Sequence, residues 1–313
     1  MISRRRVLTA AAGLGAGSFG LGGLAVAGSY GLQITRYALT PPNWPAGLHL
    51  KLAIVTDLHA CDPWMSADRI RGIVQTTNAL EADAVLLLGD FVAGKRLARL
   101  SSIVPHHVWA GELAALKAPL GVHAVLGNHD WWESDELQET MQGQVPAQAA
   151  LEAAGIPVYQ NRAVRLMKDA KPVWLAGLGD QWAYYLYRHR EKRRGPDGKL
   201  PFFVGVDDLP ATLAMVTDDA PIVLMVHEPD IFPAVPDRVA LTVAGHTHGG
   251  QVRVFGFAPI IPSLYGRRYD YGHIVEDDRN LIVSAGLGCS NMPLRLGAVP
   301  EIVAIELGGP ALI

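Results

Sequence analysis

Side chains of the kinds that bind metal ions follow one short apolar run after another along this chain. The apolar runs are 52–56, 84–88, 122–126, 222–226 and 241–244. The polar residues that follow them are Asp57, His59, Asp90, Asn128, His129, Asp130, His227, His246 and His248. Short runs rich in β-branched residues are typical of buried strands. Ligands bind at the carboxyl ends of strands in open α/β sheets, so we expect these side chains to gather at one edge.

Between the first two apolar runs, apolar residues recur at the spacing of a helix. Ile70, Ile73, Val74 and Leu80 recur on one helical face behind Ser66, a possible N-cap. Further helices are expected near 111–117, 146–154 and 209–216, and further strands at 173–176, 281–284 and 302–307. This alternation predicts a layered α/β architecture.

Composition excludes several classes of protein. Twenty-seven basic and thirty acidic residues give a net charge of −3, so no nucleic-acid partner is expected. Two cysteines cannot form a four-thiolate zinc site or a disulfide-dense scaffold. Cys61 and Cys289 could form one disulfide or remain two free buried thiols, and the sequence leaves both options open.

The first 28 residues are predicted to be a targeting segment. Arg4, Arg5 and Arg6 precede a stretch, residues 7–35, that carries no charged residue and is rich in Ala, Gly and Leu. This is typical of a twin-arginine export signal, and the stretch is also long enough for a membrane anchor. We expect export across the cytoplasmic membrane by the twin-arginine machinery to a periplasmic or other extracytoplasmic location, with anchoring by the N-terminus as the alternative to cleavage.

The remainder is predicted to be one domain. Residues 29–49 are interpreted as a linker or edge segment and residues 50–308 as the domain. Residues 181–204 are interpreted as an insertion crowded with basic and aromatic side chains. That insertion could contact a membrane surface or a substrate phosphate, or it could be a solvated loop.

The residue types at the strand ends indicate a metal site. Residues two apart in a strand point the same way, so Asp57 and His59 can bind one ion together. A single strand-end Asp is usually a helix cap and a single His is usually structural, but the ordered series argues otherwise. Mixed carboxylate, amide and imidazole ligands suit Mn, Fe, Zn or Ni rather than Ca or Cu(I).

The full pattern, D-x-H, G-D, G-N-H-D, H and G-H-x-H, resembles the calcineurin-like metallophosphoesterase family over about residues 50–308. The resemblance implies an α/β/β/α sandwich with two divalent ions as cofactors. It implies that Asp57, His59 and His248 hold one ion, that Asn128, His227 and His246 hold the second, and that Asp90 bridges them. Two ions at such a site can hold a bridging hydroxide that hydrolyses a phosphate ester.

His129 has no metal position left to fill under this assignment. We therefore expect it to protonate the leaving group or to stabilise the transition state, with Asp130 orienting its ring.

Further phrases, among them 227–232 (HEPDIF) and 245–252 (GHTHGGQV), resemble an exported subgroup related to bacterial UDP-2,3-diacylglucosamine hydrolases. This resemblance implies a phosphodiesterase or pyrophosphatase at the cell envelope, for which a lipid-linked phosphoester such as UDP-2,3-diacylglucosamine is a candidate substrate. Arg295 is expected either to contact a phosphate oxygen or to form a surface ion pair. The alternative function is a non-catalytic metal- or ligand-binding protein on the same fold. A serine esterase is disfavoured because the chain has no G-x-S-x-G motif.

Overall fold

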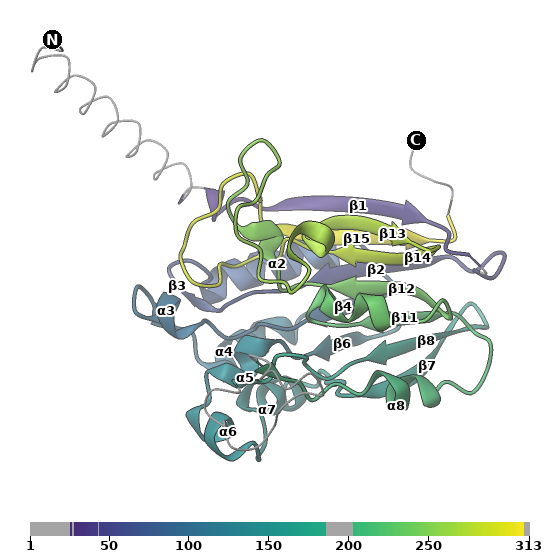
Figure 1. The fold of residues 1–313 in the computed structure, drawn as a ribbon, viewed down its shortest axis with the longest axis horizontal. Coiled ribbons are helices and arrows are strands. Elements are labelled where there is room, and N and C mark those ends of the chain that lie inside the picture. Colours follow the sequence, from purple (N-terminus) through teal and green to yellow (C-terminus); the bar gives the residue numbers. More distant parts are fainter. Residues whose placement is uncertain (1–25, 27, 43, 186–202, 310–313) are drawn as a thin grey trace, which may run out of the picture.

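Two mixed β-sheets pack face to face in the computed structural model, which describes residues 26, 28–42, 44–185 and 203–309 (Figure 1). The first sheet has the order β1 (Gln33–Leu39), β15 (Glu301–Leu307), β2 (Leu50–Val55), β4 (Ala84–Leu88) and β6 (Val122–Val125). The second has the order β13 (Gly272–Glu276), β14 (Arg279–Val283), β12 (Val239–Ala244), β11 (Ile222–Met225), β8 (Lys171–Gly177) and β7 (Arg162–Lys168).

Successive side chains of each strand point to opposite faces of its sheet, and this alternation produces the layers of the fold. In β2, Leu50, Leu52 and Ile54 are buried between the sheets, whereas Ala53 and Val55 face the helices outside the first sheet. In β11, Val223 and Met225 enter the core between the sheets, and Leu224 enters the core on the outer face of the second sheet. Both faces of these strands are therefore buried, as continuous apolar runs predict.

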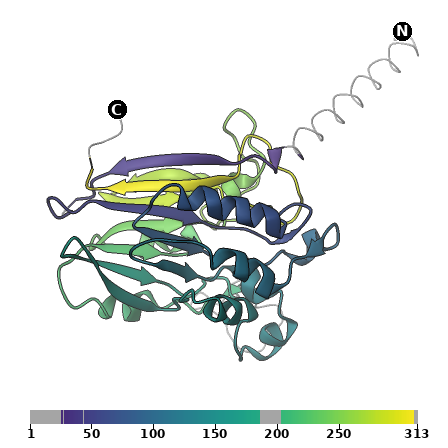
Figure 2. The ribbon, with the colours of Figure 1, turned by 180° about the vertical axis from the view of Figure 1, so that it is seen from behind.

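Helices cover the two outer faces. The first sheet is covered by α2 (Ala67–Asn78), α4 (His106–Leu113) and α7 (Pro146–Ala153), and Figure 2 shows α2 lying across it. The second sheet is covered by α8 (Leu209–Ala214) and the 3-10 helix η2 (Pro229–Ala234). The predicted α/β class and the α/β/β/α layering are confirmed.

The remaining elements are short and lie in the connections. They are β3 (Cys61–Asp62), α3 (Lys95–Ala98), β5 (Ser102–Ile103), α5 (Asn128–Trp132), α6 (Asp135–Thr140), β9 (Tyr184–Tyr185), β10 (Phe203–Val204), η3 (His248–Gly250) and η4 (Gly266–Tyr269). No helix among the described residues is long and apolar enough to cross a membrane.

Strand register brings the predicted polar residues to one edge. β2, β4 and β6 are parallel, with Val55 beside Leu87 and Leu88 beside Val125. In the other sheet β11 and β12 are parallel, with Met225 beside Val243. Because neighbouring strands end level with one another, the residues that follow them meet at the carboxyl edge.

Most predicted elements are present, with some differences in their limits. Ser66 caps α2, since its side chain accepts a hydrogen bond from the backbone N–H of Arg69. The helix expected at 111–117 was wrongly placed: α4 begins at His106, directly after Pro105, and ends at Leu113. Pro at a helix start is favourable because it lacks the N–H that would go unpaired there.

The predicted division into domains stays a prediction. Residues 33–39 form an edge strand paired in parallel with β15, and β9 pairs with β10 at the two ends of the 181–204 segment. Residues 186–202 lie outside the described residues, as does nearly all of the predicted targeting segment 1–28. Cys61 and Cys289 are free and buried, which settles the question of their pairing.

The stack of Trp109 on Phe91 supports the loop that carries Asp90. The two rings lie 5.2 Å apart and nearly parallel, and Trp109 is 1% exposed. We expect Trp109→Ala to lower the free energy of unfolding by about 3–5 kcal/mol, because it leaves a large cavity. Met167→Ala, on an exposed position of β7, should cost less than about 0.5 kcal/mol. Urea denaturation of both variants is the measurement, and equal small losses would contradict the packing role.

Candidate metal centre

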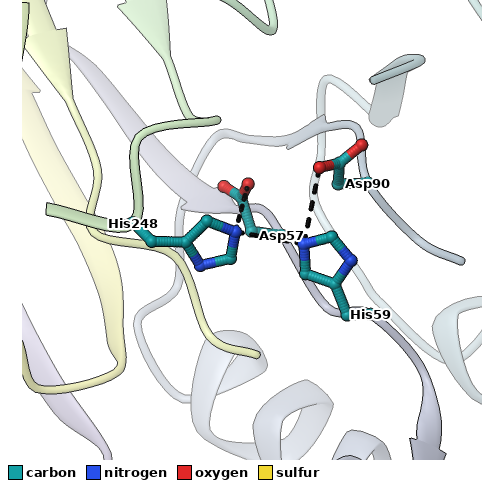
Figure 3. Close-up of side chains that lie close together, drawn as sticks. All are labelled: Asp57, His59, Asp90 and His248. Carbon is teal, nitrogen blue, oxygen red and sulfur yellow. Dashed lines mark hydrogen bonds and ion pairs between the residues drawn. The ribbon is translucent and has the colours of Figure 1, made fainter. Parts of the chain in front are cut away.

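The predicted ligands come together as two groups that share Asp90. Oxygen and nitrogen atoms of Asp57, His59, Asp90 and His248 lie within 4.8 Å of one another, and so do those of Asp90, His227 and His246. All of these residues are buried. Figure 3 shows the first group, in which His248 points at Asp57 and His59 points at Asp90.

The backbone of these loops is held in an uncommon conformation. Asp57, His59, Asp90, His246 and His248 all have φ between 48° and 69°. Non-glycine residues with positive φ carry strain that the surrounding structure must offset, and such residues cluster at functional sites. Here backbone hydrogen bonds hold the loops, because the N–H of Asp57 donates to Gly89 and the N–H of His59 donates to Asp90.

Two glycines allow the sheets to approach at this edge. A Cβ added to Gly127 would lie 2.5 Å from Asp90 Oδ1 and 2.6 Å from His227 Cε1. A Cβ added to Gly245 would lie 2.5 Å from Asp57 Oδ2. Any side chain at either position would displace a candidate ligand.

Hydrogen bonds behind the rings fix two of the imidazoles. His59 Nδ1 lies 3.0 Å from the carbonyl oxygen of Val92, and His227 Nδ1 lies 2.6 Å from that of Leu88. Because a carbonyl oxygen only accepts, both Nδ1 atoms carry the proton. The Nε2 atoms of His59 and His227 therefore face the site.

Asp90 stands between these two rings. Its Oδ2 is 3.4 Å from His59 Nε2 and 3.3 Å from His227 Nε2, while its Oδ1 accepts the backbone N–H of His129 at 2.8 Å. One carboxylate oxygen is thus anchored and the other lies at the junction of the two groups.

Asn128 and His246 complete the second group. His246 Nδ1 lies 2.8 Å from Asn128 Oδ1 and 3.3 Å from His227 Nε2. In the first group, His248 Nε2 lies 3.3 Å from Asp57 Oδ1 and 3.0 Å from His59 Nε2. Imidazole nitrogens, carboxylate oxygens and an amide oxygen therefore converge from loops of both sheets.

Burial determines the charges of these groups. It lowers the pKa of His59 and of His246 to about 3, so both rings are neutral. It also raises the pKa of Asp57 to about 6. Burial opposes ionisation of Asp90, but the neighbouring His227 and His129 hold its pKa well below the usual value. Burial opposes protonation of His227, but Asp90 raises its pKa well above the usual value. Divalent ions require neutral imidazoles and ionised carboxylates, so an ion bound at His227 would displace its proton.

The residues present fit two ions. Ring nitrogens of His59, His227, His246 and His248 surround two carboxylates within a buried space, and these are donor types that divalent cations accept as ligands. The donors divide into two sets with Asp90 common to both. The structure therefore contains a site of the dimetal type, built from buried Asp and His groups.

Asp130 does not orient His129, which corrects the expectation from sequence. Its carboxylate accepts four backbone N–H groups, from Asp90, Phe91, Val92 and Gly127, at 2.9–3.2 Å. Asp130 thus ties the loop after β4 to the loop after β6. Desolvation and the nearby Asp90 raise its pKa to about 7.

His129 is held instead by two residues that sequence reasoning missed. Its Nδ1 lies 3.2 Å from Glu133 Oε1, one helical turn later, and its Nε2 lies 3.4 Å from Ser290 Oγ. Burial opposes its protonation, but Asp90 and Glu133 together raise the pKa of His129 above the usual value. The i, i+4 spacing of His129 and Glu133 was a signal that the sequence offered.

Arg295 does not reach the substrate side, so both expectations for it were wrong. It is 1% exposed, and its guanidinium donates to the backbone carbonyls of Gly288, Ala285 and Ala298. Its Nη2 also lies 3.0 Å from Nδ1 of His248. Arg295 therefore holds the loop between β14 and β15 against a candidate metal ligand.

Two buried acids behind His227 were also missed. Asp180 and Glu228 lie together, and burial raises the pKa of Glu228 to about 7 and that of Asp180 well above its usual range. Glu228 directly follows His227 in the HEPDIF phrase, but nothing in the sequence pairs it with Asp180. Because the pKa of each acid is raised, the two carboxyl groups beneath the site do not both carry a negative charge.

The site opens into a cavity of about 370 Å³. One wall is aromatic, formed by Trp132, Trp182 and Tyr185, and Lys95 and Arg96 line another part. Asp90, Asn128, His129 and His246 are among its lining residues. The cavity gives a ligand access to His129, to the shared Asp90 and to the second ligand group.

Known proteins resemble this chain over most of its length. YkuE, an uncharacterized metallophosphoesterase of Bacillus subtilis, is 26% identical over 303 residues, covering 93% of this chain and 94% of the relative. An uncharacterized metallophosphoesterase of Aquifex aeolicus is 27% identical over 284 residues, covering 90% and 94%. The phosphodiesterase YaeI of Escherichia coli is 27% identical over 308 residues, covering 98% and 100%.

Residues 50–250 match the family described as calcineurin-like phosphoesterase. This range includes all seven candidate ligands and covers more than half of the 313 residues. The predicted family and the predicted metal-dependent hydrolase class are thereby confirmed. The chain belongs to the calcineurin-like phosphoesterase family and is a metal-dependent phosphoesterase.

Proposed function

We propose that the protein hydrolyses a phosphodiester or a pyrophosphate by means of two divalent ions. The observation that carries this proposal is the position of Asp90, whose Oδ2 lies between the imidazoles of His59 and His227. A carboxylate shared by two ligand sets is suited to hold two ions near each other. The name of the Escherichia coli relative, a phosphodiesterase, supports the choice of a diester.

The ligands are assigned from the two groups. Asp57, His59 and His248 would hold one ion, Asn128, His227 and His246 would hold the other, and Asp90 would contact both. When bound, such ions neutralise phosphate charge and activate water. The donor set suits Mn, Fe, Zn or Ni.

His129 is proposed as the proton donor to the leaving group. It lines the cavity, and its backbone N–H is bonded to Asp90, which places its ring beside the ligands. Glu133 would hold the ring through Nδ1, so that Nε2 points toward Ser290 and the cavity. A positioned imidazole can protonate a departing oxygen as the ester bond breaks.

The cavity favours an ester with a bulky, partly apolar group. Trp132 and Trp182 offer ring surface, and Arg96 and Lys95 offer positive charge for a second phosphate. Lys95 is also bonded to Asp135 at 2.8 Å, which fixes its ammonium near the cavity. A nucleoside-diphosphate-linked lipid, such as UDP-2,3-diacylglucosamine, combines these features and is the proposed substrate class.

Export is proposed from the sequence alone. The arginines at 4–6 and the uncharged stretch 7–35 support transport by the twin-arginine machinery and action at the cell envelope, with the N-terminus either cleaved or retained as an anchor. The phrases at 227–232 and 245–252 support placement in the exported subgroup related to UDP-2,3-diacylglucosamine hydrolases.

Asp90→Asn tests the shared ligand. Because an amide bridges two cations poorly, we expect metal-dependent hydrolysis of bis-p-nitrophenyl phosphate to fall by at least about 100-fold. The assay follows p-nitrophenolate release after metal removal and resupply of Mn. Asp237→Asn, at a side chain that is 88% exposed, is the matched control and should retain full activity. Activity of Asp90→Asn within a few-fold of wild type would refute a bridging role.

His129→Gln tests the proton donor. A general acid matters most when the leaving group is a poor one, so loss should be about 10²–10⁴-fold for diphenyl phosphate and much smaller for bis-p-nitrophenyl phosphate. Glu133→Gln should show the same dependence with a smaller loss, because it acts through His129.

Steady-state kinetics on the two substrates, with metal content measured for each variant, provides the comparison. An equal loss on both substrates at full metal content would exclude proton donation. A wild-type protein that binds metal but hydrolyses neither diester would instead favour a non-catalytic binding protein.

A further inference from the structure

An apolar loop projects from the domain beside the metal centre. Residues 254–265, here called the apolar loop, contain no charged residue. Phe255 is fully exposed, Ile260 is 77% exposed and Leu264 is 72% exposed, and Val254, Phe257 and Tyr265 are also exposed. An exposed apolar patch of this density on a folded domain marks an interaction surface.

The tip of the apolar loop is a built turn. Val254 and Phe257 exchange backbone hydrogen bonds at 2.9 and 3.0 Å, which leaves Phe255 and Gly256 as the two central residues. Their φ values are 50° and 78°. A hairpin turn with two positive φ values favours Asn or Gly at its first central position, so an aromatic residue there is strained. The turn thus holds Phe255 at the apex against its own backbone preference.

Polar contacts at the base hold the apolar loop in place. One amino group of Arg253 donates to the carbonyl of Gly256 at 3.0 Å, and the other is paired with Asp270 at 3.0 Å. At the far end, Asp230 accepts hydrogen bonds from Ser263 and from the backbone of Leu264. The apolar side chains are therefore presented by a braced loop.

Cationic groups flank the apolar side chains. The guanidinium of Arg267 lies over the ring of Phe257, 4.8 Å from its centroid, and Arg268 follows it. Arg268 is half-exposed and is also paired with Glu276. Apolar residues at an apex with basic residues behind them match the interface of an anionic bilayer, where acyl chains lie below charged headgroups.

The first described residues of the chain lie close to the base of the apolar loop. Gly28 and Gly31 pack closely on Arg295 and Val299, and the backbone N–H of Arg253 donates to the carbonyl of Leu296. The first described residues and the base of the apolar loop therefore both contact residues 295–299. Figures 1 and 2 show the start of β1 and the apolar loop at the same end of the sandwich. The described start of the chain, residues 28–31, therefore lies on the same side of the domain as the apolar loop.

We propose that the apolar loop docks the protein on an anionic lipid bilayer, with Phe255, Ile260 and Leu264 entering the interface. Pro262 of the same loop lines the cavity of the metal centre, so docking would bring that cavity to the membrane surface. The docking itself is independent of the proposed function. Its consequence, access to a lipid-linked phosphoester, rests on that function.

A fluorophore that reports local polarity tests the docking in the full chain. Cysteine is introduced as Phe255→Cys or, as the matched control, Met167→Cys on β7, which is exposed at the far edge of the second sheet. The native thiols are buried, so a maleimide dye reacts at the new site. Vesicles of equal parts phosphatidylcholine and phosphatidylglycerol are then added. The emission should shift to the blue at position 255 and stay unchanged at position 167.

Two results would overturn the proposal. If the chain sediments with vesicles while the dye at position 255 keeps its emission in water, the N-terminal segment alone makes the contact. If the blue shift arises without vesicles and grows with protein concentration, a second copy of the chain covers the loop.

A second variant separates docking from folding and from catalysis. Phe255→Asn suits the positive φ, so the fold should be at least as stable as the wild type. With the dye at Ile260→Cys, the apparent equilibrium constant for burial in vesicles should fall about tenfold, because one large apolar side chain is lost. Hydrolysis of soluble bis-p-nitrophenyl phosphate should not change. An unchanged burial constant would contradict the proposal, whereas an inactive wild type would count only against the proposed function.

Discussion

The structure depends on holding several polar side chains in one buried place without water. Asp57, Asp90 and the imidazoles of four histidines lie within a few ångströms of one another, and each would be costly to bury alone. The backbone meets part of this cost: the carbonyls of Val92 and Leu88 fix two of the rings, and backbone N–H groups fix both carboxylates. The imidazole nitrogens and carboxylate oxygens converge on two positions, where divalent cations would bind.

The two-sheet architecture makes this arrangement possible. Parallel strands from both sheets end at one edge, so loops that are distant in sequence deliver ligands to a common point. Gly127 and Gly245 allow the closest approaches, and the positive φ values of the ligand-bearing residues turn their side chains inward. Asp130 and Arg295, neither of which faces the cavity, hold these loops together. Strain at the site is therefore offset by hydrogen bonds directly beneath it.

The sequence predicted what depends on local pattern and residue type. Apolar runs located the strands, and D-x-H, G-D, G-N-H-D and G-H-x-H located the ligands, because each motif lies within a few residues of a strand end. Contacts between distant segments left no such pattern. Arg295 was expected to contact a phosphate oxygen or to form a surface ion pair, yet it is buried and donates to backbone carbonyls of its own loop. Asp130 was expected to orient the ring of His129, but its oxygens instead accept hydrogen bonds from four backbone N–H groups of two loops. The exposure of the apolar loop could not be predicted, since short apolar stretches are more often core.

The central claim is that two metal ions bind on either side of Asp90. Crystals of the protein grown with Mn and measured at the manganese absorption edge test it most directly, because anomalous scattering locates each ion without any assumption about its ligands. The account predicts two peaks, one beside Asp57, His59 and His248 and one beside Asn128, His227 and His246, each in contact with Asp90. A single peak at full Mn saturation, or peaks that do not contact Asp90, would contradict it.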